Sequence, residues 1–443
     1  MPHTYMVITF GCQMNEYDSE VLAGVLESMG FNQSDSLELT DIVLLNTCCV
    51  RGTAENKVFS MLGRLRLLKQ KRPGLLIGVS GCMPQQEGMA AKLRHGFPHV
   101  DLILGAGGAH RLPELLGNVL SDRKPRVGVD QGTHIIVENL PVKRTAGVRA
   151  WVPIMYGCDN FCTYCVVPYV RGRERSRLPE DILRTISDLP RSGFREVVLL
   201  GQNVNSYGKD LAGEIDFARL LRRIETETEG ICRVRYMTSH PRDFYPGLVD
   251  VIADLDKVCE HFHLPVQAGS NRILREMNRG YTREEYLSLI ERIKTRIPEA
   301  TVTTDIMVGF PGEEEEDFQD TLDLVTQAEF DSAYTFIYNI RSGTPAAVMP
   351  GQIPEAVKKK RIQELLAMQS RISLARNQSE TGRVQEVLAE GEHKSGSGLL
   401  VGRNRGNKTV IFPGDPQLLG GLVQVRITKS HLANLEGEIY REQ

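Results

Sequence analysis

Residues 156–177, YGCDNFCTYCVVPYVRGRERSR, contain three cysteines in a CxxxCxxC arrangement: Cys158, Cys162 and Cys165. Three thiolates on one tight loop can hold three irons of a cubane iron–sulfur cluster and leave the fourth iron without a protein ligand. The spacing differs from the CxxCxxC run of bacterial ferredoxins, and no histidine lies near enough in sequence to complete a zinc set of four. A cluster with one open iron is therefore the best match, and a chance spacing is the alternative.

An open iron can bind a small chelating molecule. The amino and carboxylate groups of S-adenosylmethionine are suited to that role. A low-potential cluster bound in this way can pass one electron to the sulfonium and cleave it. The cysteine stretch thus predicts a redox cofactor and a second, chelating cofactor at the same site.

The sequence around the cysteine stretch alternates between strands and helices. Six apolar runs typical of buried strands lie between residues 151 and 340, separated by helical patterns such as PEDILRTISDL and REEYLSLIERIKTRI. Six units without a seventh or eighth predict an open, partial (βα) barrel, whose active site lies at the carboxyl ends of the strands. The cysteines follow the first run directly, so we expect them at that mouth. The runs are WVPIMYG, EVVLLG, RVRYMT, CEHFHLPV, ATVTTDIMVG and SAYTFIY.

Other residues at the predicted mouth are candidates for binding the chelating cofactor. Gln202, Asn203 and Asp305 are polar residues at the ends of apolar strands. Gly309 and Gly312 follow the fifth run, where glycine permits a close approach of the backbone to a ligand.

The first 125 residues predict a separate α/β unit. The strand-like runs TYMVITF, DIVLLN and LLIGVS alternate with helical patterns, which favours a parallel sheet with helices on both faces. Cys12, Cys48 and Cys82 each follow one of these runs. Loops at the carboxyl ends of parallel strands share one edge, so the three cysteines are expected to converge there. Three buried structural cysteines are the alternative interpretation.

The C-terminal quarter changes character. Residues 354–379 predict one long amphipathic helix. Residues 380–443 contain short alternating segments such as GLLVGR, KTVIFPG and GLVQVRITKSH. Five short strands of this kind predict a small β-barrel of the oligonucleotide-binding type.

Length, composition and charge exclude several classes of protein. The chain has 443 residues, is 41% hydrophobic and 25% charged, and lacks an apolar run long enough to cross a membrane. Its start lacks the features of a secretory signal, so the cytoplasm is expected. Nine cysteines, an odd number in a long chain, favour metal binding over a disulfide framework. The net charge of −3 excludes a uniformly basic nucleic-acid coat, but not local basic patches.

Local basic runs indicate an RNA partner, although a solvated helix face is the alternative for each. One run spans residues 57–72, and another, Lys358 to Arg361, opens the long helix. The candidates for RNA contact beside the cysteine loop and on the small barrel are Arg171, Arg173, Arg403, Arg405, Lys408 and Phe412.

Taken together, these motifs resemble the methylthiotransferase family of the radical S-adenosylmethionine superfamily. GCQMNEYDSE (11–20), NTCCVRGTAENK (46–57) and GCMPQ (81–85) resemble its N-terminal domain, and residues 156–177, LLGQNVNSYG (199–208) and TDIMVGFPGE (304–313) its radical core. GRNRGNKTVIF (402–412) resembles the TRAM barrel. The resemblance implies an α/β fold with an N-terminal methylthiotransferase domain (1–125), a linker (126–143), a radical core with a partial (βα)6 barrel (144–376) and a TRAM barrel (377–443).

The resemblance implies two [4Fe-4S] clusters and S-adenosylmethionine as cofactors. Cys158, Cys162 and Cys165 would hold the radical cluster, and Cys12, Cys48 and Cys82 an auxiliary cluster. Cys49 stands where the family commonly has serine or alanine, and it could compete with Cys48 as a ligand. Cys48 aligns with the family's cysteine and is the predicted ligand.

The GCQMN and NTCxVR motifs resemble the branch of the family that acts on tRNA. The implied reaction is radical methylthiolation of carbon 2 of N6-isopentenyladenosine beside the anticodon, with two S-adenosylmethionine molecules per turnover. Implied partners are that tRNA, an electron donor such as flavodoxin or ferredoxin, and sulfur or cluster assembly proteins. Two alternatives stay open: a methylthiotransferase for threonylcarbamoyladenosine in tRNA or for a ribosomal-protein aspartate, and a non-catalytic iron–sulfur or RNA-binding protein.

Overall fold

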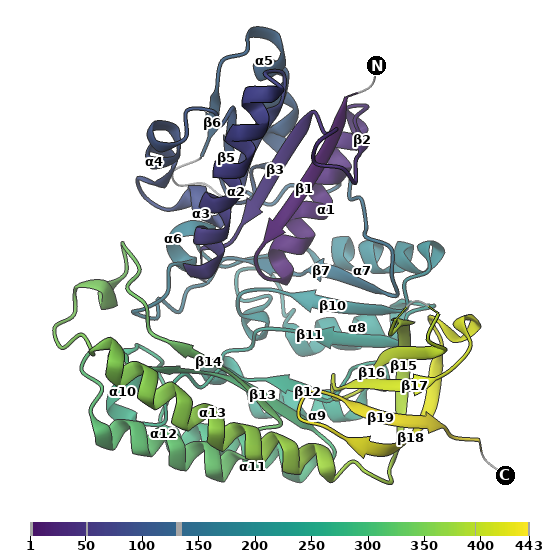
Figure 1. Ribbon diagram of the computed structural model, residues 1–443. Coiled ribbons are helices and arrows are strands. Elements are labelled where there is room, and N and C mark those ends of the chain that lie inside the picture. The colour runs from purple at the N-terminus through teal and green to yellow at the C-terminus, as the bar shows by residue number, and fades with distance from the viewer. Residues whose placement is uncertain (1–2, 50–51, 130–134, 395, 442–443) are drawn as a thin grey trace.

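The computed structural model describes residues 3–49, 52–129, 135–394 and 396–441. Three units follow one another along the chain (Figure 1): an α/β domain at the top, a curved α/β body beneath it, and a small barrel at one end of that body.

The N-terminal unit is a parallel sheet of six strands in the order β2-β1-β3-β4-β5-β6. The predicted linker therefore begins with a strand of this sheet. The strands are β1 (Thr4–Phe10), β2 (Asn32–Gln33), β3 (Ile42–Thr47), β4 (Leu76–Gly81), β5 (Leu102–Leu104) and β6 (Arg126–Gly128), and the helices are α1 (Gln13–Ser28), α2 (Gly52–Lys71), α3 (Cys82–Gln85), α4 (Met89–Gly96), η1 (Gly108–Arg111) and α5 (Leu112–Asp122).

Helices cover both faces of this sheet, as the alternation of strands and helices predicts. Successive side chains of a strand point to opposite faces. Leu44 of β3 accordingly packs with α1 and α5 in one apolar cluster. Its neighbours Val43 and Leu45 pack with α2 and α4 in another. All six residues of β3 are buried, and the first four, Ile42 to Leu45, are apolar.

The middle unit is the expected open barrel. Its six parallel strands form two sheets, β11-β10-β7 and β12-β13-β14, and the bridge between Val234 and Val258 links them. The strands are β7 (Arg149–Pro153), β10 (Glu196–Leu200), β11 (Arg233–Tyr236), β12 (His261–His263), β13 (Thr301–Val308) and β14 (Ser332–Ile337). The helices are α6 (Val167–Arg171), α7 (Pro179–Asp188), α8 (Phe217–Glu227), α9 (Pro246–Asp254), α10 (Asn271–Glu276), α11 (Arg283–Arg296) and α12 (Glu315–Ala328), with short 3-10 turns η2 (Leu189–Ser192), η3 (Val204–Ser206), η4 (Pro241–Asp243) and η5 (Pro345–Val348).

The long C-terminal helix, α13 (Glu355–Gln378), lies along β14 and α12 (Figure 1). Part of its buried side is polar, unlike that of an ordinary amphipathic helix. Lys358 donates to the carbonyl oxygen of Tyr338 at 3.0 Å, and Arg361 pairs with Glu313 at 2.8 Å. The basic run that opens the helix therefore supplies two of its cations to the interior and not to a partner.

The C-terminal unit is a closed five-stranded barrel in the order β15-β16-β17-β19-β18. Its strands are β15 (Val384–Glu392), β16 (Leu399–Asn404), β17 (Thr409–Pro413), β18 (Leu422–Ser430) and β19 (Leu435–Ile439), and η6 (Pro416–Leu418) follows β17. Alternating inward side chains, including Val387, Leu400, Val410 and Phe412, fill its centre.

Two buried arginines fasten this barrel to the amino-terminal ends of the middle strands. Arg233, the first residue of β11, donates to the carbonyl oxygens of Arg403 and Glu386 at 2.6 and 2.8 Å. Arg235 donates to the Arg405 carbonyl at 2.7 Å and pairs with Glu196 at 2.8 Å. The barrel thus occupies the end of the body opposite the mouth (Figure 1).

Candidate functional site

The Cys158–Cys165 loop is held at the mouth by its own backbone. The antiparallel strands β8 (Met155–Tyr156) and β9 (Arg175–Ser176) close its base. Cys158 N–H donates to the Gly172 carbonyl at 3.1 Å, and Cys165 N–H to the Cys162 carbonyl at 2.9 Å. Gly157 has a φ of +80°, and a Cβ there would lie 1.9 Å from the Arg173 oxygen. Only glycine permits this turn, which directs the cysteines toward one another.

Cys162 is buried beside a buried cation, and Cys158 and Cys165 are partly exposed. Arg279 donates from Nη1 to the Cys162 sulfur at 3.3 Å and from Nη2 to the Pro265 carbonyl at 2.6 Å. Burial raises the pKa of Cys158 and of Cys165 to about 12. Thiolates in such a place need compensating positive charge, which the irons of a cluster supply.

Cys12, Cys48 and Cys82 meet at one edge of the N-terminal sheet. They follow β1, β3 and β4, which are adjacent strands, with Phe10 beside Thr47 and Thr47 beside Gly81. A hydrogen bond with the Cys48 thiol is the largest cause that lowers the pKa of Cys12 to about 6; burial opposes it, and the positive charge of Arg171 assists. The topology therefore brings together three cysteines that are far apart in sequence.

Cys49 lies buried behind this set. A hydrogen bond with the Cys82 thiol raises the pKa of Cys49, and burial raises it further. The same hydrogen bond lowers the pKa of Cys82, where burial opposes it. Cys165 of the loop also lies near enough to raise the pKa of Cys49 electrostatically. Cys49, Cys82 and Ala106 pack against Val166 and Val170 of the loop segment. The two cysteine sites therefore adjoin across the junction of the two domains.

The donor sets fit iron–sulfur clusters better than single ions. Within the described part of the chain, no three His, Cys, Asp or Glu side chains lie close enough to hold one metal ion. A cubane spreads its cysteine ligands over separate irons, so its thiolates stand wider apart than those around one ion. Each site offers three thiols, and the N–H of one buried arginine contacts a sulfur in each. Hydrogen bonds to sulfur of this kind are a usual feature of cluster sites.

The polar residues predicted at the mouth have internal partners. Gln202 accepts the N–H of Gly157 at 2.5 Å, which ties β10 to the cysteine loop. Asn203 is fully buried and donates to Asp243 at 2.7 Å. Asp305 lies 3.5 Å from His263 and is partly exposed. Gln202 and Asn203 thus hold the loops of the mouth in place, and Asp305 is left facing solvent in part.

The two predicted glycines serve the protein's own backbone. Gly309 has a φ of +75°, and a Cβ there would collide with the side chain of Lys358. Gly312 has a φ of +76°, and its N–H donates to the Gly351 carbonyl at 2.8 Å. Gly309 thus adjoins Lys358 and Gly312 adjoins Gly351, and close approach of a cofactor to these glycines stays a prediction.

Four of the predicted RNA contacts are buried or are held by partners within the protein. Arg171 is buried, and Arg405 is held by Glu260 and by the carbonyl of Val258. Lys408 pairs with Asp331 at 3.0 Å, and Phe412 is wholly enclosed in the barrel. Arg171 is enclosed by the N-terminal domain and Phe412 by the barrel to which it belongs. Arg405 and Lys408 pair with carboxylates of the body, which the sequence alone does not show.

The other two predicted RNA contacts remain accessible. The side chain of Arg173 is 70% exposed and lies over the ring of Phe161, 4.7 Å from its centroid. Arg403 is partly exposed, 3.6 Å from Glu390. Arg173 stands beside the cysteine loop at the mouth, where an anionic partner can reach it.

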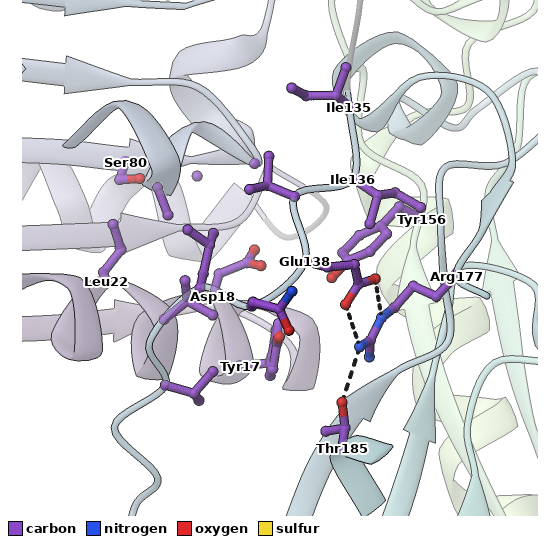
Figure 2. A pocket seen from close by; sticks show the side chains of 18 of the residues that line it. Tyr17, Asp18, Leu22, Ser80, Ile135, Ile136, Glu138, Tyr156, Arg177 and Thr185 are labelled. Atoms are coloured by element: carbon purple, nitrogen blue, oxygen red, sulfur yellow. Dashed lines mark hydrogen bonds and ion pairs between the residues drawn. The ribbon is translucent and has the colours of Figure 1, made fainter. Parts of the chain in front are cut away.

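A cavity of about 160 Å³ lies between the N-terminal domain and the body (Figure 2). Tyr17 and Asp18 of α1 form one wall, Tyr156 and Arg177 lie on the body's side, and residues 135–140 run along it. Arg177 donates to both carboxylate oxygens of Glu138 at 2.7 Å and to Thr185 at 3.1 Å. The linker is thus fastened to the body beside this cavity.

Sequence analysis missed several of these residues. Arg279, Asp18 and Glu138 contact the sites or their borders, yet each is a single charged residue with no spacing signal around it. Their roles depend on which elements the fold brings together.

Comparison with known proteins agrees with this architecture. Three family models match: "Uncharacterized protein family UPF0004" over residues 4–105, "Radical SAM superfamily" over 152–325 and "TRAM domain" over 378–440. Among solved structures, the radical S-adenosylmethionine methyltransferase TsrM from Kitasatospora setae has a TM-score of 0.57 at 15% identity, covering 79% of this chain and 77% of its own. The cobalamin-dependent radical enzyme OxsB has a TM-score of 0.53 at 13% identity, covering 83% of this chain and 56% of its own. Both likenesses concern the fold.

Two curated relatives match nearly the full length. A tRNA-2-methylthio-N(6)-dimethylallyladenosine synthase from Pelotomaculum thermopropionicum is 64% identical, covering 98% of this chain and 97% of its own. One from Desulforamulus reducens is 58% identical, covering 98% and 95%. Fold and sites together define a three-domain radical S-adenosylmethionine protein. Within that class, the chain belongs to the family of tRNA-2-methylthio-N(6)-dimethylallyladenosine synthases. Among the described residues, no helix is long and apolar enough to span a membrane.

Proposed function

We propose that this protein transfers a methylthio group to carbon 2 of N6-isopentenyladenosine (N6-dimethylallyladenosine) beside the anticodon of tRNA. The observation that carries the proposal is the meeting of two three-cysteine sites at one domain junction, where Cys49 behind Cys82 lies near Cys165. A sulfur-insertion reaction needs a radical generator and a sulfur carrier within reach of one base. Family membership and the TRAM barrel support a tRNA substrate.

In this proposal, Cys158, Cys162 and Cys165 hold the radical [4Fe-4S] cluster, and Cys12, Cys48 and Cys82 hold the auxiliary one. When bound, the clusters supply one electron that cleaves S-adenosylmethionine and an iron that carries the sulfur to be inserted. A second S-adenosylmethionine supplies the methyl group. Asp305 is the candidate contact for the cofactor, because it lies within β13 beside His263, the last residue of β12, and is partly exposed.

The chain's own residues position the cysteine loop, compensate the charge of its thiolates and limit the access of water. Gln202 and the glycine turn at Gly157 fix the direction of the loop. Arg279 compensates thiolate charge inside the protein, where few waters can do so. Exclusion of water protects a reactive radical from side reactions. The adenine must leave its stack to enter such a site, at a cost of a few kcal/mol that RNA binding has to offset.

Arg173 is the proposed contact for an RNA phosphate near the mouth, because its guanidinium is exposed and already oriented by Phe161. An electron donor such as flavodoxin or ferredoxin, and proteins that deliver sulfur or clusters, complete the proposed set of partners.

Anaerobic reconstitution with iron and sulfide tests the proposal. The protein receives dithionite, S-adenosylmethionine and one of two tRNAs, carrying either N6-isopentenyladenosine or threonylcarbamoyladenosine, and the digested nucleosides are weighed. The expected result is a mass gain of one methylthio group on isopentenyladenosine alone. Deoxyadenosine without a nucleoside gain would point to another methylthiotransferase substrate. Absence of both, with iron loaded at both sites, would leave only a non-catalytic iron–sulfur role.

A further inference from the structure

Arg171 belongs to the body of the molecule, but its charged end lies in the N-terminal domain. It is the last residue of α6, which follows the Cys158–Cys165 loop. Its Nε donates to the Cys82 sulfur at 3.1 Å, and its Nη2 donates to Asp18 of α1 at 2.7 Å. The residue is only 6% exposed. One side chain therefore links the radical loop to a thiol of the other cysteine site.

Burying a guanidinium in this place carries a desolvation cost, so its partners must compensate. The Asp18 carboxylate balances the charge of the Arg171 guanidinium. The Nε–H of Arg171 still donates a hydrogen bond to the Cys82 sulfur. A hydrogen bond and a cation beside a cluster ligand favour the more reduced, more negative state of the cluster. The Arg171–Cys82 contact therefore stabilises the reduced state of a cluster at this site, in addition to linking the two domains.

We propose that Arg171 is a positioning residue for the auxiliary site: it orients Cys82 and raises the reduction potential of the cluster held there. The inference rests on the proposed function, because it needs a cluster on Cys12, Cys48 and Cys82. It also gives the segment that carries the radical cysteines a direct contact with the sulfur-carrying site.

A purely mechanical role makes a different prediction. If Arg171 acted only by clasping Asp18, then Asp18→Asn and Arg171→Met would loosen the same contact and shift the potential in the same direction. In our proposal the two shifts are opposite. Removing the cation makes reduction harder, whereas removing the Asp18 anion makes it easier.

The test uses the full chain with Cys158, Cys162 and Cys165 all changed to Ala, so that one cluster remains. Its midpoint potential is measured by anaerobic titration followed by electron paramagnetic resonance, with iron and sulfide content alongside. Arg171→Met, Arg171→Lys and Asp18→Asn are compared in this background. Arg173→Met serves as the matched control, because it removes an exposed arginine from the same segment.

We expect Arg171→Met to lower the equilibrium constant for reduction at least tenfold, a fall of about 59 mV for one electron. The midpoint potential of Arg171→Lys is expected to fall by less, and that of Asp18→Asn to rise. The potential of Arg173→Met is expected to equal that of the background protein. An unchanged potential in Arg171→Met with full iron overturns the proposal, as does a shared downward shift with Asp18→Asn. A background protein that binds no iron refutes the auxiliary cluster itself, which is a failure of the proposed function and is visible before any Arg171 variant is compared.

If Arg171→Met loses its cluster, the potential is measured in Arg171→Lys, and the thermal unfolding of the cluster-free proteins distinguishes a positioning role from a structural one. Cluster loss with an unfolding temperature equal to that of the background supports positioning of Cys82. Cluster loss with a lower unfolding temperature shows a merely structural role and overturns the proposal.

Discussion

The two cysteine sites are built in contrasting ways. The Cys158–Cys165 loop closes on itself through backbone hydrogen bonds and the β8–β9 pair, so one segment carries all three thiols. Cys12, Cys48 and Cys82 come from three strands, and their meeting depends on the register of the whole sheet. A local site can thus be assembled by a short segment, whereas a dispersed site requires the complete domain.

Their electrostatic surroundings differ as well. Burial raises the pKa of Cys158 and Cys165 to about 12. Cys12 has its pKa lowered to about 6, chiefly by the Cys48 thiol and then by Arg171. The dispersed site therefore stabilises negative charge through a neighbouring thiol and through an arginine of the body, while the loop site depends more on the positive charge that it binds.

The largest effect is expected from removing the loop site. Changing Cys158, Cys162 and Cys165 together to Ala abolishes cleavage of S-adenosylmethionine, because no other cysteine of the loop can replace them. The dispersed site keeps its metal, so roughly four irons per chain remain. Chromatographic assay of deoxyadenosine and iron analysis measure both quantities. Loss of all iron would contradict the auxiliary cluster on Cys12, Cys48 and Cys82.

Removing one thiol of the dispersed site separates the two chemical steps. Cys48→Ala is expected to abolish the methylthio product while cleavage of S-adenosylmethionine continues, because the loop site is intact. Cys49→Ala is the matched control, one residue away and equally buried, and it keeps iron and product. Mass analysis of nucleosides measures the product. The reverse outcome would make Cys49 the ligand and Cys48 its neighbour.

A smaller effect is expected at the cation of the loop site. Arg279→Lys keeps the charge but loses the guanidinium geometry that reaches both the Cys162 sulfur and the Pro265 carbonyl. Residues that support metal ligands typically contribute about 10–100-fold to affinity or activity. Cleavage of S-adenosylmethionine, measured per loop-site cluster, is expected to fall by about tenfold. Unchanged cleavage would remove Arg279 from the account of this site.

The smallest effect concerns the exposed edge of the loop site. Arg173→Ala removes one accessible cation, which as an exposed charge is worth about 1 kcal/mol or less. Binding of tRNA is expected to weaken by a few fold, and the salt dependence of the affinity to lose about one unit of slope. Filter binding at several salt concentrations measures both. Arg191→Ala is the control, because it removes an exposed arginine that precedes β10, at the end of the body opposite the mouth.

The same contrast explains what sequence could predict. The loop site could be predicted because all three cysteines, with their characteristic spacing, lie in one short stretch of sequence. The dispersed site could be predicted only because each cysteine follows a recognisable strand, and the carboxyl ends of parallel strands meet at one edge of the sheet. Both arguments use regularities of chain geometry, and the strands β1, β3, β4, β10 and β13 lie close to their predicted positions.

The contacts between units could not be predicted in this way. Arg171, Lys408 and Phe412 have sequence surroundings that suit an exposed nucleic-acid contact. Contacts between domains engage Arg171 and Lys408, and the core of its own barrel encloses Phe412. Gly309 and Gly312 accommodate Lys358 and Gly351, which arrive from a later helix and loop. The sequence around a residue does not show which distant segment will pack against it.

The central claim is that the loop site generates a radical that acts on carbon 2 of the base, while the dispersed site supplies sulfur. Transfer RNA carrying deuterium at carbon 2 of its isopentenyladenosine tests this claim most directly. The account predicts that deuterium appears in 5′-deoxyadenosine in step with formation of the methylthio product. Methylthio product formed without deuterium in the deoxyadenosine would contradict it.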